Sequence, residues 1–368
     1  MDTPAPMLAK SVKDIPDPSD FDDAEHPGLL FEPKWDGFRC VVGRDGDDLV
    51  LASRNGKPLN RYFPELVEAF LAQLPERCVL DGEVIVVRGD RLDFEALQER
   101  IHPARSRVDL LARETPASYV AFDLTSLAGE DLTRTPLALR RAQLEAALEH
   151  ATAPLHVTPT TTDAAVALRW FEQFEGAGLD GVMAKPLSGT YQPNARSMFK
   201  VKHARTADVV VAGYREHKGS TPERPLLGSL LLGLYDAEGR LRHIGVAASF
   251  TQKKRAELFE LMQERVAIGD ETHPWAGWSE ITASGGRTQQ AGSRWNAGKD
   301  LSFVPVTPDL VCEVGYDHME GERFRHTGQF KRWRTDRDPE TCGYDQLEEV
   351  VAYDLADILG GEPLRADG

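Results

Sequence analysis

The spacing of apolar residues changes near residue 204, and this change constrains the fold more than any other feature of the sequence. Before it, strand-like runs rich in Val, Ile, Leu and Phe alternate with amphipathic stretches typical of helices. After it, short strand-like runs surround one helical stretch, 252–265. A chain of 368 residues is long enough for two domains. We therefore expect an α+β domain over residues 1–204 and a second, β-rich domain over 205–368.

The apolar pattern predicts individual elements in both domains. In the first domain it predicts strands at 29–32, 39–43, 49–53, 78–87, 119–124, 181–185 and 198–202, and helices at 62–73, 94–101, 137–149 and 164–175. In the second it predicts strands at 207–214, 228–235, 241–246 and 310–316, with a hairpin turn at Asp236-Ala237-Glu238-Gly239. Short strands with one helix suit a small barrel such as an OB-fold, although another small β domain has the same periodicity. An amphipathic helix is expected over 344–359, in an acidic C-terminal tail.

The net charge of −16 seems to argue against a nucleic-acid partner, since a polyanion is bound mainly through Lys and Arg. However, residues 1–33 carry eight acids and two bases, and residues 338–368 carry nine acids and one base. The stretch between them is nearly neutral. Bases gather at 196–224 and 323–337, and at Lys253-Lys254-Arg255. These clusters could contact duplex phosphates, although the first could equally be an ordinary linker.

Several classes of protein are excluded by simpler features. No apolar run approaches the roughly 20 residues of a membrane span, and the acidic start does not resemble a signal peptide. The four cysteines lie far apart without a CxxC pair, which argues against a zinc ribbon or a disulfide framework. We expect a cytoplasmic protein without a membrane partner.

The most specific local pattern is Lys34-Trp35-Asp36-Gly37, with Glu32 before it and Arg39 after it. A lysine just past a strand, followed by Asp-Gly and then Arg, places an amine at a turn among groups suited to phosphates. Taken alone, the pattern is equally compatible with a surface hairpin.

Six further segments, in order along the chain, favour the catalytic interpretation. They are Ser53-Arg54-Asn55-Gly56, Leu80-Asp81-Gly82-Glu83, Ala121-Phe122-Asp123, Asp180-Gly181-Val182-Met183-Ala184-Lys185, Phe199-Lys200-Val201-Lys202 and Arg332-Trp333-Arg334-Thr335-Asp336-Arg337. With the first pattern they resemble the motifs of the nucleotidyltransferase superfamily of ATP-dependent DNA ligases, RNA ligases and mRNA capping enzymes. The resemblance departs from the family at Asp180, where Glu is usual. It implies a nucleotidyltransferase (adenylation) domain with mixed and antiparallel sheets and helices, followed by an OB-fold β-barrel.

The resemblance also implies a role for each motif residue. Lys34 would be the nucleophile that forms lysyl-AMP, with Asp36, Lys200 and Lys202 as further catalytic residues. Glu83 and Asp180 would hold Mg²⁺ or Mn²⁺. Without the resemblance, Phe122 would be assigned to the core and the Lys-x-Lys strand to a solvated edge. ATP would be held by Glu32, Arg39, Arg54, Glu83, Phe122, Lys185, Lys200, Lys202, Arg332 and Arg334.

Arg332 and Arg334, with Arg337 as a weaker candidate, would orient the pyrophosphate. Because this motif lies far from Lys34 in sequence, the second domain would close over ATP and reopen for DNA.

The motif sequences are most similar to those of short bacterial ATP-dependent DNA ligases of the stand-alone or end-joining-associated kind. Such an enzyme would seal 5′-phosphate/3′-hydroxyl nicks in duplex DNA through lysyl-AMP and DNA-adenylate, in DNA repair and recombination. Its partners would be nicked duplex DNA and repair proteins of unknown identity, and we expect a monomer. The alternatives are an RNA ligase or capping-type guanylyltransferase, and a non-catalytic OB-fold protein that binds nucleic acid. Labelling of Lys34 with AMP, with GMP or with neither distinguishes them.

Overall fold

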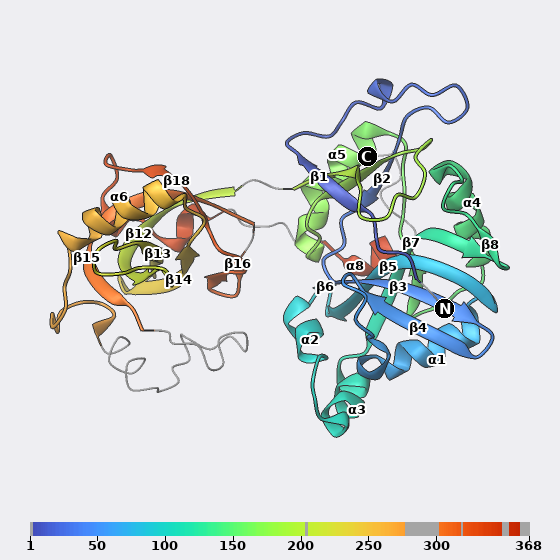
Figure 1. The fold of residues 1–368 in the computed structure, drawn as a ribbon, viewed down its shortest axis with the longest axis horizontal. Helices are drawn as coiled ribbons and strands as arrows, with labels where there is room; N and C mark the ends of the chain where they lie inside the picture. The colour runs from blue at the N-terminus through green and yellow to red at the C-terminus, as the bar shows by residue number, and fades with distance from the viewer. Residues whose placement is uncertain (1–2, 203–204, 277–301, 318, 348–352, 361–368) are drawn as a thin grey trace. The chain divides into compact units, whose positions relative to one another are not determined.

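The computed structural model of this chain describes residues 3–202, 205–276, 302–317, 319–347 and 353–360. The chain divides into two units (Figure 1): the first comprises residues 1–202 with 350–368, and the second comprises residues 203–349. The division falls next to the change in apolar spacing near residue 204. No helix among the described residues is long and apolar enough to cross a membrane.

The larger sheet of the first unit has seven strands, and helices pack on one of its faces. Phe70 of α1, Leu97 of α2 and Leu144 of α4 are fully buried in the core between this sheet and the helices. The strand order is β4-β3-β5-β7-β8, with β6 paired to β5 and β9 to β7. The elements are β3 (Phe38–Asp45), β4 (Asp48–Ser53), α1 (Pro64–Gln73), β5 (Arg77–Arg88), β6 (Arg91–Leu92), α2 (Phe94–Glu99), α3 (Arg105–Glu114), β7 (Ala117–Leu127), β8 (Glu130–Asp131), α4 (Leu137–Ala147) and β9 (Leu155–Val157).

The smaller sheet of the first unit has four strands in the order β1-β11-β10-β2. It consists of β1 (Leu8–Val12), β2 (Leu29–Pro33), β10 (Val182–Pro186) and β11 (Arg196–Val201), and α5 (Ala164–Gln173) packs on one face. Strand β1 is parallel to β11, whereas β10 is antiparallel to both of its neighbours. The sequence did not predict β1, because its five residues alternate between apolar and polar too briefly to be recognised, and they form a strand by pairing with β11.

The last described helix, α8 (Leu355–Leu359), lies on the first unit and not on the second. Leu355 and Ile358 are fully buried in the same core cluster as Trp170 and Phe174. The backbone N–H of Leu355 donates to the carbonyl of Asp90 at 2.9 Å. The prediction that the second domain continues to the C-terminus is therefore wrong for these residues, because their apolar side chains complete the core beside α5.

The prediction of one helix over 344–359 is also wrong for the described part of that range. Residues Tyr344–Gln346 form a single 3-10 turn, and Leu347 at its end is extended. A new helix starts after Asp354, whose side chain accepts a hydrogen bond from the backbone N–H of Ala356 as an N-cap. The apolar spacing alone could not locate this break.

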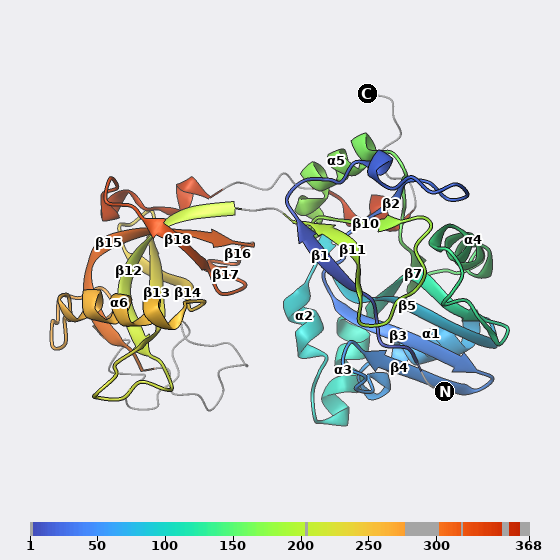
Figure 2. The same ribbon diagram turned by 45° about the horizontal axis from the view of Figure 1, so that its top comes forward.

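The second unit is a small β-barrel with one long helix, α6 (Gln252–Gln263) (Figure 2). Its five-stranded sheet has the order β14-β13-β12-β15-β18. A bridge between Ala247 and Gly328 joins the end of β14 to the start of β18 and so closes the sheet. The predicted hairpin turn is present, since the N–H of Asp236 donates to the carbonyl of Arg240. The strands of the second unit are β12 (Arg205–Glu216), β13 (Leu227–Tyr235), β14 (Leu241–Ala247), β15 (Val304–Tyr316), the short pair β16 (Met319–Glu320) and β17 (Arg323–Phe324), and β18 (Gln329–Trp333).

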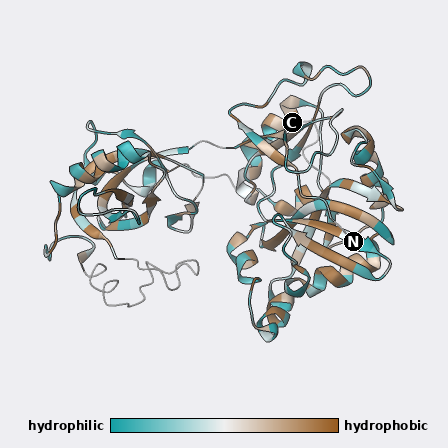
Figure 3. Cartoon of the chain, in the orientation of Figure 1, coloured by the Kyte–Doolittle hydropathy of each residue, from teal (hydrophilic) through white to brown (hydrophobic). Residues whose placement is uncertain are grey.

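Apolar residues concentrate on the central strands of each unit, and polar residues on the outer faces of the helices (Figure 3). In the second unit the barrel interior includes Val209, Val211, Leu230 and Leu232, all fully buried. Each unit therefore has its own hydrophobic core, as expected for two domains in a chain of this length.

Candidate active site

A cavity in the first unit lies between the two sheets, and one of its walls is the four-stranded sheet. Met183 of β10 pairs with Glu32 of β2 and with Lys200 of β11. Because alternate residues of a strand share a face, this register directs Lys34, Lys185 and Lys202 to the same side. Ala9 and Ser11 of β1, with Met7 just before it, extend the wall past β11, and Met198 lies on β11 itself.

The opposite wall comes from the seven-stranded sheet. Arg39 of β3 pairs directly with Glu83 of β5, so both side chains lie on the same face. Phe122 lies where the β5–β7 register shifts, and this bulge turns its ring into the cavity. Arg54, just beyond β4, completes the wall. All ATP-binding residues predicted in the first unit thus line one cavity.

Lys34 and Lys202 share one carboxylate oxygen of Asp180. The Nζ atoms of Lys34 and Lys202 each lie 2.6 Å from Oδ2 of Asp180. Burial would raise the pKa of Asp180, but the two ammonium groups lower it overall. Asp180 is therefore a carboxylate at neutral pH whose charge is already compensated.

The backbone holds Lys34 against Asp180. The N–H of Lys34 donates to the carbonyl of Gly181 at 2.8 Å, and the N–H of Asp180 donates to the carbonyl of Lys34 at 3.0 Å. These bonds continue the antiparallel pairing of β2 with β10. Gly181 has φ +124°, and a Cβ there would collide with the carbonyl of Val201, so the motif requires glycine at this position.

The predicted adenine-binding residues form a second group. Nζ of Lys185 lies 2.6 Å from Oε2 of Glu32, and both side chains are buried. The other carboxylate oxygen of Glu32, Oε1, is buried and has no hydrogen-bond partner among the described residues. Nζ of Lys185 also lies 4.6 Å from the ring centroid of Phe122. A buried acceptor next to an aromatic ring in a cavity is suited to a ligand that carries an amino group on a flat ring.

The carboxylate of Asp81 holds the guanidinium of Arg39 in place. The Nε and Nη2 atoms of Arg39 each lie 2.5 Å from an oxygen of Asp81, a bidentate pair. The guanidinium carbon is 4.4 Å from the ring centroid of Phe122. The hydroxyl of Tyr191 donates to Oδ2 of Asp81 at 2.7 Å. Tyr191 was not predicted as a site residue, because it lies in a loop without a motif that the sequence analysis used.

Burial and charge shift the pKa values of two further groups in the cavity. Burial raises the pKa of Glu83 to about 7, although Arg39 and Lys34 oppose the shift. Burial, together with the ammonium groups of Lys202 and Lys34, lowers the pKa of Lys200. A cation bound in the cavity would therefore favour the ionised form of Glu83, and anionic oxygens would favour the ammonium form of Lys200.

Two predicted residues lie just outside the cavity lining. Within the described part of the chain, the lining includes neither Asp36, in the turn between β2 and β3, nor Asp180. The described residues also contain no group of three or more His, Cys, Asp or Glu side chains that could hold a metal ion by themselves. Glu83 fits a Mg²⁺ or Mn²⁺ ion that takes its other oxygens from phosphates and water. Direct ligation by Asp180 stays a prediction, since its Oδ2 binds two lysines.

The basic motif of the second unit forms ion pairs within that unit. Arg334 donates two hydrogen bonds to Asp208, at 2.7 and 2.9 Å, and two to Asp336, at 2.8 and 2.9 Å. Nε of Arg337 lies 3.5 Å from Asp208, and Arg332 pairs with Glu313 at 2.8 Å. The predicted contacts of these arginines with ATP stay predictions.

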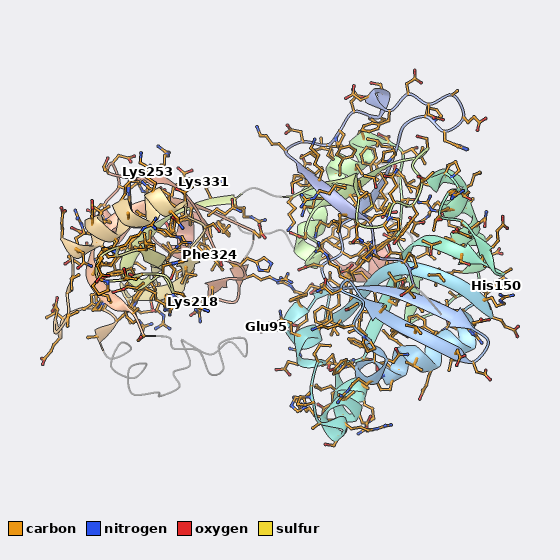
Figure 4. All side chains as sticks on the ribbon, in the orientation of Figure 1. Glu95, His150, Lys218, Lys253, Phe324 and Lys331 are labelled. Atoms are coloured by element: carbon orange, nitrogen blue, oxygen red, sulfur yellow. The ribbon has the colours of Figure 1, made fainter. Side chains whose placement is uncertain are left out.

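The second unit also presents basic side chains where α6 meets β18. Figure 4 labels Lys253 at the start of α6 and Lys331 on β18. The two elements meet there, since Nζ of Lys254 lies 5.7 Å from the ring centroid of Phe330. This cluster of exposed bases suits contacts with a phosphate backbone.

Two protein-family models match the chain, one on each unit. The model of the ATP dependent DNA ligase domain matches residues 6–202, and the model of the ATP dependent DNA ligase C terminal region matches residues 223–337. The chain belongs to the ATP-dependent DNA ligases. The predicted order of a nucleotidyltransferase domain and an OB-fold domain is thereby confirmed.

Individual relatives support the same assignment of this ligase. It is 54% identical to DNA ligase C of Mycobacterium tuberculosis over 97% of both chains. It is also 54% identical to DNA ligase C2 of Mycolicibacterium smegmatis over 94% of both chains. A solved Lig E DNA ligase, 17% identical, has the same fold with a TM-score of 0.52, covering 91% of this chain and 100% of that chain. The RNA-ligase, guanylyltransferase and non-catalytic alternatives are not favoured by these comparisons.

Proposed function

We propose that this ligase seals nicks between a 5′-phosphate and a 3′-hydroxyl in duplex DNA during repair, with Lys34 as its nucleophile. The observation that carries the proposal is the convergence of Lys34, Lys200 and Lys202 on the cavity that also holds Glu32 and Phe122. An amine for attack, cations for phosphate oxygens and a nucleobase pocket are the three requirements of the first step.

In that step, Nζ of Lys34 attacks the α-phosphorus of ATP, a P–N bond forms, and the bond to pyrophosphate breaks. A nucleophilic amine must be unprotonated, and so Lys34 has to give up the proton that it donates to Asp180 in this structure before it attacks. Lys200 and Lys202 would stabilise the charge that develops on the phosphate oxygens.

The later steps transfer the same AMP group to DNA. An oxygen of the nick 5′-phosphate attacks the lysyl-AMP phosphorus, which releases Lys34 and gives DNA-adenylate. The 3′-hydroxyl then attacks the 5′-phosphate, a phosphodiester forms, and AMP leaves. Arg39 and Arg54 would hold the ribose or phosphate groups through their guanidinium groups.

Glu83 would be the principal carboxylate for the Mg²⁺ or Mn²⁺ ion of this family. The bound ion would supply positive charge at the phosphate oxygens. The protein itself provides the buried carboxyl of Glu83. Its raised pKa means that the ionised form is costly unless a cation binds beside it. Asp36 is the remaining predicted catalytic residue, two residues after Lys34 in the Lys-x-Asp-Gly turn.

The second unit would supply the remaining cations. We propose that Arg332 and Arg334 orient the pyrophosphate of ATP, and that Lys253, Lys254 and Lys331 contact phosphates of the duplex. Lys253 and Lys331 are exposed, and Lys254 lies half-buried against Phe330 of β18, which supports the second role. Such contacts are independent of DNA sequence, so binding of nicked duplex should weaken steeply as the salt concentration rises. Association with repair proteins, a position at the nucleoid and a monomeric state are parts of the same proposal.

The decisive experiment is self-labelling with ATP carrying a labelled α-phosphate, in the presence of Mg²⁺ or Mn²⁺. The native protein should acquire covalent AMP, and Lys34→Ala should not. Lys10→Ala is the matched control, because Lys10 is an exposed lysine on β1 of the same unit. Equal labelling of Lys34→Ala and native protein would overturn the assignment of Lys34.

A second arm tests the substrate. The native protein should seal a nicked DNA duplex far better than the RNA equivalent, and ATP should label it far better than GTP. Labelling from GTP in preference to ATP would instead favour a guanylyltransferase. Efficient joining of RNA alone would favour an RNA ligase.

A further inference from the structure

Tyr191 connects the two walls of the cavity. It lies in the loop between β10 and β11 of the smaller sheet, yet its hydroxyl donates to Asp81 on β5 of the larger sheet at 2.7 Å. Its side chain is only 3% exposed, and Asp81 is fully buried. The hydrogen bond is therefore shielded from water, where its direction and strength matter most.

The ring of Tyr191 is fixed on several sides. It packs in a small apolar cluster with Met7 and Met198, which belong to the cavity wall formed by the smaller sheet. The guanidinium carbon of Arg140 lies 5.9 Å from the ring centroid. The backbone N–H of Tyr191 donates to the carbonyl of Thr133 at 2.8 Å. These contacts hold the ring so that its hydroxyl points at Asp81.

Asp81 in turn orients Arg39. Three donors converge on its carboxylate: Nε and Nη2 of Arg39, each at 2.5 Å, and the hydroxyl of Tyr191. Burial raises the pKa of Tyr191, so the hydroxyl remains a proton donor at neutral pH. With its carboxylate partner fixed, the guanidinium carbon of Arg39 lies over the ring of Phe122, 4.4 Å from its centroid, and both residues line the cavity.

We propose that Tyr191 is a positioning residue for ATP: through Asp81 it holds Arg39 in the orientation that the nucleotide requires. This inference rests on the proposed function, in which Arg39 contacts the ribose or phosphate of ATP. Tyr191 itself touches no reacting atom. Its hydroxyl acts indirectly, through Asp81 and Arg39, in the same way as a residue that hydrogen-bonds to a metal ligand and so orients that ligand.

The test is Tyr191→Phe, which keeps the ring in its cluster and removes only the hydroxyl. We expect the ATP concentration that gives half-maximal lysyl-AMP formation to rise about tenfold, as for the loss of one hydrogen bond to a charged group. In Arg39→Gln protein, the same substitution should produce no further rise, because the residue through which Tyr191 acts is already gone. Thermal unfolding of each variant confirms that it is folded.

Tyr119→Phe is the matched control. Tyr119 is also fully buried in the first unit, and its hydroxyl donates to the carbonyl of Cys40 at 3.0 Å. Its loss should lower the unfolding temperature without changing the dependence on ATP.

Three results would overturn the proposal: an unchanged ATP dependence in Tyr191→Phe, an equal change in Tyr119→Phe, or an additive change in the Arg39→Gln background. Absence of lysyl-AMP on the native protein would instead refute the proposed function, and so the two failures are distinguishable.

Discussion

Lys185 and Glu32 form a buried ion pair in which Nζ of Lys185 lies 2.6 Å from Oε2 of Glu32. Because Lys185 binds only one of the two carboxylate oxygens, Oε1 remains available, and it has no protein partner among the described residues. The lysine compensates the buried charge, while the second oxygen is left for a ligand donor. The pair thus keeps a negatively charged acceptor inside the cavity.

This arrangement predicts that Glu32 discriminates between nucleotides. Glu32→Gln replaces one carboxylate oxygen by an amide donor, so an adenine amino group would lose its charged acceptor. We expect the preference for ATP over GTP in lysyl-AMP formation to fall by about tenfold to a hundredfold. Half-maximal nucleotide concentrations for ATP and GTP measure this directly. Glu65→Gln, which disturbs a pair with the fully buried Arg100 in the same unit, should leave the preference intact; an unaltered preference in Glu32→Gln would exclude the role.

A second prediction concerns Arg334. Because Arg334 would contact the pyrophosphate only in the first step, Arg334→Ala should slow lysyl-AMP formation by at least about tenfold. Sealing of a nick that already carries AMP should change far less. Arg240→Ala is the control, since Arg240 also pairs with an aspartate in the second unit but lies in an exposed turn. Equal slowing of both steps in Arg334→Ala would mean that the residue acts through DNA binding or stability.

A third prediction concerns α8. Ile358 is fully buried on the first unit, and so Ile358→Ala should reduce the free energy of unfolding of that unit by about 2–5 kcal/mol. Leu168→Ala, on the exposed side of α5 where the side chain is 47% exposed, should change it by less than about 1 kcal/mol. Urea unfolding followed by tryptophan fluorescence compares the two variants. Similar small losses in both would show that α8 contributes nothing to the core.

The position of α8 also affects how the second unit can be tested. Deletion of residues 205–368 would remove α8 together with the barrel, and lost activity could then reflect a damaged first unit. Point substitutions such as Arg334→Ala avoid this ambiguity.

A fourth prediction concerns pH and His243 in the second unit. Burial, with the neighbouring charges of Arg323 and Arg215, lowers the pKa of His243 well below its usual value. Nη2 of Arg323 lies 2.9 Å from Nδ1 of the ring, which therefore accepts a hydrogen bond and is neutral. Below about pH 6.5 the unfolded chain binds a proton that the folded chain does not, and so stability should fall by up to about 1.4 kcal/mol per pH unit.

Urea unfolding at pH 7.5 and at pH 5.5 measures this loss. His243→Gln should reduce the difference between the two conditions, whereas His217→Gln, at an exposed loop position of the same unit, should not. If the native protein and His243→Gln lost stability in parallel, another group would be responsible.

The sequence by itself determined which chemistry-bearing residues meet in the first unit. Lys185 and Lys200 lie on strands, and Lys34 and Lys202 directly follow β2 and β11. The period of two therefore assigns each side chain to a face without knowledge of the partner strand. The hairpin turn at 236–239 was equally local, since Asp236 and Gly239 specify it within a few residues. The order of the motifs then indicated a nucleotidyltransferase domain followed by an OB-fold domain.

Only the tertiary structure decided which partner each of these residues contacts. Asp180 lies 146 positions from Lys34 and Tyr191 lies 110 positions from Asp81, so no local pattern couples them. For the same reason the sequence did not predict β1, nor that α8 packs on the first unit. Each is short: β1 is a strand through its pairing with β11, and α8 buries Leu355 and Ile358 in the core beside α5. Long-range packing, which local periodicity cannot encode, thus places the terminal segments and fixes the hydrogen bonds that orient the site.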